Sequence, residues 1–355
     1  MNAKSDFKNI TEYGFNFPAK LILVTLFITL GFYILACCIG SVYISPITLI
    51  KISLNQLPGF AYEANWPMSH ETILLNLRLP RVTLAAIVGA GLAFSGTIYQ
   101  GLFKNPLADP YLIGSASGAA LGATIIITLP FINQINPIVL PITAFIGAMF
   151  AVFISYSIAR NSTGLNLATL ILSGVAISTL FGAITTLLMI KSNPDVRPVL
   201  SWLMGSFISS QWIHCLITLC YVTPCILVAI AYSKILNIMQ LHDNQAKTLG
   251  VNLEQVKLVL IIIATITTAA CVSFVGLVGF VGLICPHAIR LMWSKDYRVL
   301  IPTAAIIGSA FLIISDTVAR TIFENTELPI GIITAFCGVP FFIFLLVKQK
   351  WWIND

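Results

Sequence analysis

Ten apolar runs divide this chain, and each is close to the length that a helix needs to cross a lipid bilayer. A membrane-spanning helix takes about 20 predominantly apolar residues. Of the 355 residues, 58% are hydrophobic and only 9% are charged, whereas a soluble domain carries about 25% charged residues. The sequence therefore predicts an all-α integral membrane protein with about ten spans, at 21–43, 80–102, 112–130, 138–159, 167–190, 211–233, 257–275, 278–292, 299–320 and 329–347.

Lysines and arginines in the polar breaks predict how the chain is oriented. If the N-terminus is cytoplasmic, thirteen of these residues fall inside and six fall outside. Positive residues are enriched on the cytoplasmic side of membrane proteins. We therefore expect a cytoplasmic N-terminal segment over 1–20, one membrane domain over 21–347 and a cytoplasmic tail over 348–355. The basic residues form no single patch, so the net charge of +6 is not a sign of nucleic-acid binding.

Glycines mark two places where helices should pack closely. Gly114, Gly118 and Gly122 recur at four-residue spacing after an earlier run dense in glycine and alanine. Small residues at this spacing let helix backbones approach each other in lipid. Glycines also recur every three residues from Gly276 to Gly282. There we expect a sharp turn between the seventh and eighth spans, packed inside protein because exposed backbone is costly in lipid.

Three of the arginines on the predicted outer side lie at the ends of spans, where topology does not require them. Arg78 and Arg81 precede the second span, and Arg320 ends the ninth. They are candidates for receiving an acidic partner, or for reaching the membrane interface with long side chains. Asp316 lies four residues before Arg320 on the same helix face, which predicts an ion pair. An acid inside a membrane can also relay protons.

The inner break at 234–256 has the signals of a short, capped helix. Asp243 can cap its start, and Gly250 can end it. Asn252, with a glutamine three residues later, forms a candidate capping box for the next span. Such a helix is either a docking surface for a soluble partner or an ordinary connector, and the loop alone favours neither.

No catalytic motif is present in the sequence. It lacks HExxH, GxSxG and the phosphate-binding GxxxxGK[ST], so ATP hydrolysis would require another chain. The eight cysteines contain no CxxC pair and are read as apolar thiols rather than metal ligands. His287 is either a structural residue or a ligand or proton carrier. We expect neither an enzyme nor a bound metal or cofactor.

Five motifs, taken in order, resemble one family of permeases. They are RLPR at 78–81, NPLADP at 105–110, GLVGFVGLICPHAIRL at 276–291, DTVAR at 316–320 and ELPIG at 327–331. Together they are similar to the permeases of ATP-driven importers for iron–siderophore complexes, haem and cobalamin, the FecCD type. The resemblance extends from about residue 76 to residue 347.

The resemblance implies a type II ABC importer permease with ten helices per subunit. It implies a homodimer or paired permeases, with the pathway between the two subunits. A periplasmic or lipid-anchored binding protein would dock outside, and two ATP-binding subunits would dock inside. ATP would be used by those partners, with no cofactor in this chain. The complex would lie in the inner (cytoplasmic) membrane, in contact with lipid and not with nucleic acid.

The resemblance also assigns residues to roles. Arg78, Arg81 and Arg320 would dock the binding protein. The loop that couples to the ATPase would fall on 241–256. The fifth span would line the pathway, and some relatives have adjacent hydroxyl residues where Leu167 and Ala168 stand here. The candidate coupling residues are Asp243, Ala246, Lys247, Leu249 and Gly250, and the pathway or gate candidates are Leu167, Ala168 and Thr169.

The function that follows is import of an iron(III)–siderophore or similar chelate delivered by a binding protein. Alternative cargoes within the family are cobalamin, haem, or another metal complex or oxyanion. A proton-driven secondary transporter is an alternative of another class. It would need buried acids, and Asp316 is its one candidate.

Overall fold

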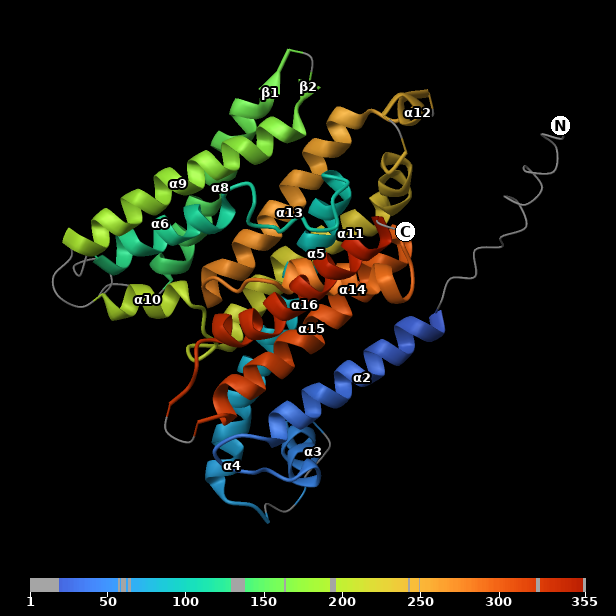
Figure 1. The fold of residues 1–355 in the computed structure, drawn as a ribbon. Coiled ribbons are helices and arrows are strands. Elements are labelled where there is room, and N and C mark those ends of the chain that lie inside the picture. The colour runs from blue at the N-terminus through green and yellow to red at the C-terminus, as the bar shows by residue number, and fades with distance from the viewer. Residues whose placement is uncertain are drawn as a thin grey trace.

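The protein is described here by a computed structural model that covers residues 19–353, apart from 57, 59–61, 63–64, 129–137, 163, 192–195, 242, 249 and 324–325. Each of the ten predicted spans corresponds to a helix, as Figure 1 shows. The helices are α2 (Ala19–Cys38), α5 (Leu79–Leu102), α6 (Ser115–Thr128), α8 (Val139–Ala159), α9 (Leu167–Lys191), α11 (Trp212–Met239), α13 (Leu253–Val275), α14 (Val281–Met292), α15 (Tyr297–Thr321) and α16 (Ile330–Ile353). The predicted all-α membrane fold is confirmed.

The ten helices are not equally long. Among the described residues, seven helices are long and apolar enough to cross a membrane, whereas α6, α14 and the apolar part of α16 are shorter. Short helices at membrane depth are tolerated where protein covers their ends. Most of the α14 residues are buried or half-buried, and α14 packs against α5, α15 and α16.

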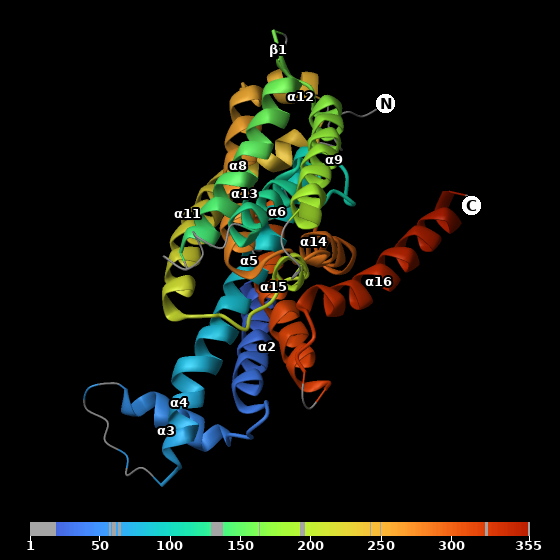
Figure 2. The same ribbon diagram turned by 90° about the vertical axis from the view of Figure 1, so that its left-hand side faces the viewer.

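Helices α5 and α13 form the centre of the bundle. Buried residues make up 78% of the most apolar window of the α5 span and 72% of that of α13, against 22% for both α2 and α9. Helix α5 packs against α11, α13, α14 and α15. Helix α2 lies at the edge of the bundle (Figure 1), and α16 points away from it (Figure 2). The apolar side chains that α2 and α9 expose therefore face lipid or another chain.

The close approach predicted from the glycines joins α6 to α8. A Cβ atom at Gly118 would overlap the carbonyl oxygen of Gly147, and one at Gly147 would overlap that of Gly118. Gly122 lies equally close to the backbone of Thr143. The prediction is confirmed for Gly118 and Gly122. It is wrong for Gly114, because α6 begins only at Ser115. Gly114 precedes the helix and has a φ of +94°.

The predicted turn between the seventh and eighth spans is also present. Gly276 ends α13 with a φ of +76°, and Phe280, at φ +69°, precedes α14. The turn is satisfied by protein, since the hydroxyl of Tyr111 donates to the carbonyl of Val278 at 2.9 Å. The backbone of Ser206 donates to Val275 at 2.8 Å. These contacts explain how irregular backbone is accommodated inside the bundle.

Short elements connect the spans at both ends. At one end lie α3 (Pro46–Asn55), α4 (Met68–Thr72), the π-helical segment Ile73–Arg78 that leads into α5, and α10 (Arg197–Leu203). At the other end lie α12 (Asp243–Thr248) and a hairpin of β1 (Arg160–Asn161) and β2 (Gly164–Leu165) (Figure 1). The short helix α12 matches the sequence prediction for the inner break. The hairpin was not predicted, because two-residue strands have no readable periodicity.

Candidate functional site

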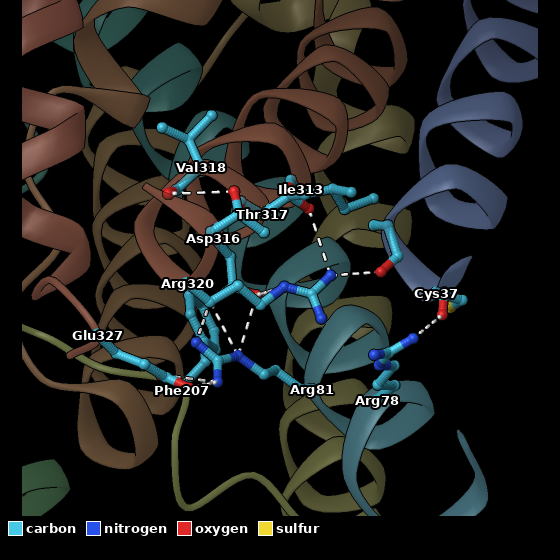
Figure 3. Close-up of polar contacts among 12 residues, drawn as sticks. Cys37, Arg78, Arg81, Phe207, Ile313, Asp316, Thr317, Val318, Arg320 and Glu327 are labelled. Carbon is cyan, nitrogen blue, oxygen red and sulfur yellow. Dashed lines mark hydrogen bonds and ion pairs between the residues drawn. The ribbon is translucent and has the colours of Figure 1, made fainter. Parts of the chain in front are cut away.

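The three predicted docking arginines meet at one end of the bundle, as Figure 3 shows. Arg81 lies in the first turn of α5, and Arg78 directly precedes that helix. Arg320 lies in the last turn of α15. They gather around the end of α2 and around Asp316, a carboxylate that is only 2% exposed. Three guanidinium groups therefore share a mostly buried cluster, which we call the arginine cluster.

Arg78 is buried and bonds to backbone. Its Nη1 donates to the carbonyls of Cys37 and Cys38 at 3.0 and 3.1 Å, and its Nη2 donates to the carbonyl of Val42. The last carbonyls of a helix have no partner within the helix. Arg78 therefore caps the C-terminus of α2, and a Cβ atom at Gly40 would meet its guanidinium and displace it.

Arg81 forms the strongest ion pair of the cluster. Its Nε donates to both oxygens of Asp316 at 3.0 Å, and its Nη2 donates to Oδ1 at 2.8 Å. Its Nη1 lies 2.8 Å from Oε2 of Glu327, a more exposed carboxylate. A guanidinium bound to two carboxylates, one of them buried, fixes α5 against α15 and the loop before α16.

Arg320 caps α2 from the other side. Its Nη2 donates to the carbonyl of Ala36, and its Nε lies 3.8 Å from Oδ2 of Asp316. The predicted pair between Asp316 and Arg320 is thus present as a long contact. The hydrogen bonds of Asp316 go instead to Arg81, which is 235 residues away in the chain. A docking role for the three arginines stays a prediction, and the contacts give them a second role in joining α2, α5 and α15.

The predicted coupling helix lies at the opposite end, as α12. It begins at Asp243 and ends at Thr248, with Ala246 fully buried. Gly250 is exposed at a φ of +78°, as expected for the residue that ends a helix. Leu249 and the side chains of Asp243 and Lys247 lie outside the described residues. The cap on the next helix is present, because Oδ1 of Asn252 accepts the backbone N–H of Gln255 at 3.3 Å.

Glu254, in the first turn of α13, is a residue that the sequence reasoning missed. Its Oε2 accepts the backbone N–H of Leu165 at 2.7 Å, and its Oε1 lies 3.3 Å from Nζ of Lys257. Gly164 packs so closely that a Cβ there would be 2.8 Å from Cδ of Glu254. The contact ties the chain just after α12 to the chain just before α9. No local pattern reveals it, since the partners are 89 residues apart.

The gate candidates lie at the start of α9 and differ in exposure. Ala168 is exposed, whereas Leu167 is half-buried and packs against the main hydrophobic core. Thr169 is half-buried, and its backbone N–H donates to Oδ1 of Asn166 at 3.1 Å, so Asn166 caps α9. Further along, α9 exposes apolar side chains that include Leu172 and Ile190. One face of this helix has no partner within the described chain.

Candidate metal ligands do not cluster among the described residues. In the part of the chain that the structure describes, no three His, Cys, Asp or Glu side chains are placed to hold a metal ion. His287 lies in α14, with its Nδ1 buried and without a hydrogen-bond partner in the structure. The predicted site residues thus lie at the two ends of the bundle, with the arginine cluster at one and α12 at the other.

Comparison with known proteins decides the class. A profile of the FecCD transport family matches residues 26–348. The chain belongs to the FecCD transport family. Its predicted resemblance to permeases of this type is confirmed.

Relatives of known name cover most of the FecCD chain. The cobalamin import system permease protein of Halobacterium salinarum is 46% identical over 284 residues, which is 80% of this chain and 76% of that protein. The hemin transport system permease protein of Yersinia pestis is 38% identical over 326 residues, covering 90% of this chain and 96% of that protein. A solved inward-facing metal-chelate type ABC transporter superposes with a TM-score of 0.81 and 29% identity, over 93% of this chain and 99% of that one.

These matches fix the class of this FecCD protein. It is a multi-pass membrane protein and a permease subunit of an ABC importer, not an enzyme. ATP hydrolysis in such importers belongs to a separate subunit. The alternative of a proton-driven transporter is therefore wrong. The only acid that supported it, Asp316, has both carboxylate oxygens bonded to Arg81.

Proposed function

We propose that this permease carries a metal chelate across the cytoplasmic membrane, with both of its termini in the cytoplasm. The observation that carries the proposal is the superposition on a metal-chelate type ABC transporter over 93% of the chain. The excess of lysine and arginine in the breaks on the α12 side supports the orientation. The arginine cluster then faces outward and α12 faces the cytoplasm.

Two copies of the permease would form the pathway between them. The exposed apolar face of α9 supports this arrangement, because an apolar helix face without a partner is stabilised by lipid or by a second chain. If the pathway runs along α9, the exposed Ala168 would lie at the cytoplasmic opening of the pathway. Small side chains there leave room for a large cargo, while a separate binding protein would supply selectivity.

Two cytoplasmic ATPase subunits would dock at α12. The buried Ala246 packs this short helix onto the bundle, and its exposed residues, such as Thr248, leave a surface for a partner. When the ATPase subunits close, α12 would move with them and displace the start of α13. The hydrogen bond between Glu254 and Leu165 would then pass the displacement to the start of α9.

A binding protein with acidic docking residues would meet the outer end. Arg81 is the arginine to test, because its side chain is 13% exposed and its ion-pair partner Glu327 is open to solvent. Replacing Glu327 by glutamine removes the carboxylate that competes for Arg81. The expected result is binding about 2–5-fold tighter, mainly through faster association, because rim charges act on the encounter step. The measurement is surface plasmon resonance with the permease in nanodiscs and the binding protein in solution.

A control keeps the docking prediction open to refutation. Glu71, a half-buried acid at the same end but outside the cluster, is replaced by glutamine, and binding should change less than in the Glu327 variant. Unchanged or weaker binding by the Glu327 variant would contradict docking through Arg81. The arginines would then have only their structural role.

The cargo is proposed as a metal chelate, with a corrinoid the first to test. The relative named for cobalamin import is 46% identical, while relatives named for iron(3+) dicitrate and iron(3+)-hydroxamate import are 32% and 30% identical. The experiment is uptake of labelled cyanocobalamin, haemin and a ferric siderophore into cells that lack their own permease and express this one with its ATPase and binding protein. ATP-dependent uptake of one chelate supports the proposal, and uptake of none contradicts it.

A further inference from the structure

A polar cavity at the cytoplasmic end lies outside the machinery described above. It has a volume of about 410 Å³ and opens between the C-terminal ends of α11 and α14 and the N-terminal end of α15. The residues that line it are Asn237, Gln240, Arg290, Lys295, Asp296 and Tyr297. The residue Gln240 directly follows α11, so the cavity adjoins the connection that leads to α12.

The two cations of this cavity have no acidic partner among the described residues. Nη2 of Arg290 donates to the hydroxyl of Tyr297 at 2.9 Å, and its guanidinium lies 5.4 Å from the centroid of that ring. Lys295 is exposed at the mouth. The ion pairs found within the described chain involve neither residue. Two positive charges therefore face one polar cavity.

The one carboxylate that lines the cavity is already bonded to other side chains. Oδ2 of Asp296 lies 2.6 Å from Nη2 of Arg298, and Oδ1 accepts Nδ2 of Asn237 at 2.7 Å. Burial raises the pKa of Asp296, but the hydrogen bonds from Arg298 and Asn237 outweigh burial and hold that pKa below its usual range. The carboxylate is thus ionised and bonded away from Arg290 and Lys295. The cavity keeps a net excess of positive charge.

The surroundings of the cavity are those of a membrane interface. Directly after Arg290, the side chains of Leu291, Met292 and Trp293 are 61%, 67% and 43% exposed. Tryptophan is enriched where the hydrocarbon core meets the headgroups. A ligand bound here would therefore meet two cations with its polar part and apolar side chains with the rest. Basic pockets between spans on the cytoplasmic side bind anionic lipid headgroups.

We propose that this cavity binds the phosphate headgroup of an anionic phospholipid from the cytoplasmic leaflet, through Arg290 and Lys295. The acyl chains would lie along Leu291 and Met292. The lipid would join the ends of α11, α14 and α15 beside the segment that leads to α12. The site belongs to the permease itself and does not depend on which chelate is carried.

Native mass spectrometry of the detergent-purified permease tests this site. Titration with phosphatidylglycerol should give a saturable adduct, and phosphatidylcholine should not. In the variant Arg290→Gln/Lys295→Gln, affinity for phosphatidylglycerol should fall about thirty-fold, and in Lys295→Gln alone about five-fold. Lys191→Gln/Lys234→Gln, which removes the same charge from exposed positions outside the cavity, should bind like the unaltered protein.

Three results would overturn the proposal. The first is equal binding of phosphatidylglycerol by the double variant and the unaltered protein. The second is equal binding of phosphatidylcholine, or displacement of the lipid by millimolar inorganic phosphate, which would make the site one for a free anion. The third is loss of co-purifying ATPase subunit from the double variant with its lipid adducts unchanged, which would assign the two cations to protein docking. The single Lys295 variant keeps the test valid if the double variant does not fold.

Discussion

Replacing Asp316 by alanine is expected to destabilise the folded permease by about 3–5 kcal/mol. The reason is that Arg81, with three hydrogen bonds to Asp316, would be left as a mostly buried cation without its main partner. Removing one member of a buried pair costs more than the pair itself contributes, because the other charge stays desolvated. The measurement is the apparent Tm of the detergent-purified protein, with the amount of folded protein recovered from membranes as a second readout.

Two variants distinguish the buried pair from general damage at this site. Arg81→Met/Asp316→Leu removes both charges and should recover much of the stability lost in Asp316→Ala, since no unpaired charge remains. Glu327→Ala, at a carboxylate that is 38% exposed, should cost no more than about 1 kcal/mol. An Asp316→Ala variant as stable as Glu327→Ala would contradict a structural role for the pair.

Replacing Glu254 by alanine is expected to uncouple ATP hydrolysis from import. The variant loses the 2.7 Å hydrogen bond from Leu165, the described side-chain link between the start of α13 and the hairpin before α9. Hydrogen bonds to charged groups contribute about 1.5–3 kcal/mol, and losing one such link should lower the chelate imported per ATP hydrolysed about ten-fold. Proteoliposomes that hold permease, ATPase and binding protein allow both quantities to be measured together.

Two further variants show whether the effect comes from the link itself. Glu254→Gln keeps an oxygen that can accept from Leu165, so it should retain more coupling than Glu254→Ala. Lys257→Met removes the other partner of Glu254 and leaves the bond to Leu165 in place, so coupling should be nearly unchanged. The link has no role in transmission if Glu254→Ala imports as much chelate per ATP as the unaltered permease.

The fold was largely predictable because the bilayer imposes a length on each helix. Apolar runs of that length located all ten helices, and the glycines predicted the close contact between α6 and α8. The error at Gly114 was one of helix boundary. The four-residue spacing of the glycines continues through the turn after Pro110 and into the helix. This spacing does not reveal that Gly114 has a positive φ, so that α6 begins only after it.

The site was predictable in its parts but not in its contacts. The motifs located Arg78, Arg81 and Arg320, yet local spacing paired Asp316 with Arg320 and missed Arg81. The hydrogen bond of Glu254 was missed for the same reason. Contacts between residues far apart in the chain depend on how spans pack, which a single sequence does not reveal. The caps on α2 could not be predicted either, because backbone carbonyls carry no sequence signal.

Cysteine labelling at α12 is the most direct test of the central claim, that this chain is a permease driven from the cytoplasm at α12 and loaded at the arginine cluster. Thr248→Cys is suitable because Thr248 is exposed and helical, whereas Gly250 has a positive φ. The exposed Cys220 and Cys337 are first replaced by alanine. Met68→Cys, in α4 at the other end, serves as the outward control.

A membrane-impermeant maleimide should label Met68→Cys in intact cells or spheroplasts and leave Thr248→Cys unlabelled. In inside-out vesicles the pattern should reverse. Labelling of Thr248→Cys in intact cells would place α12 outside, out of reach of any cytoplasmic ATPase, and would contradict the account.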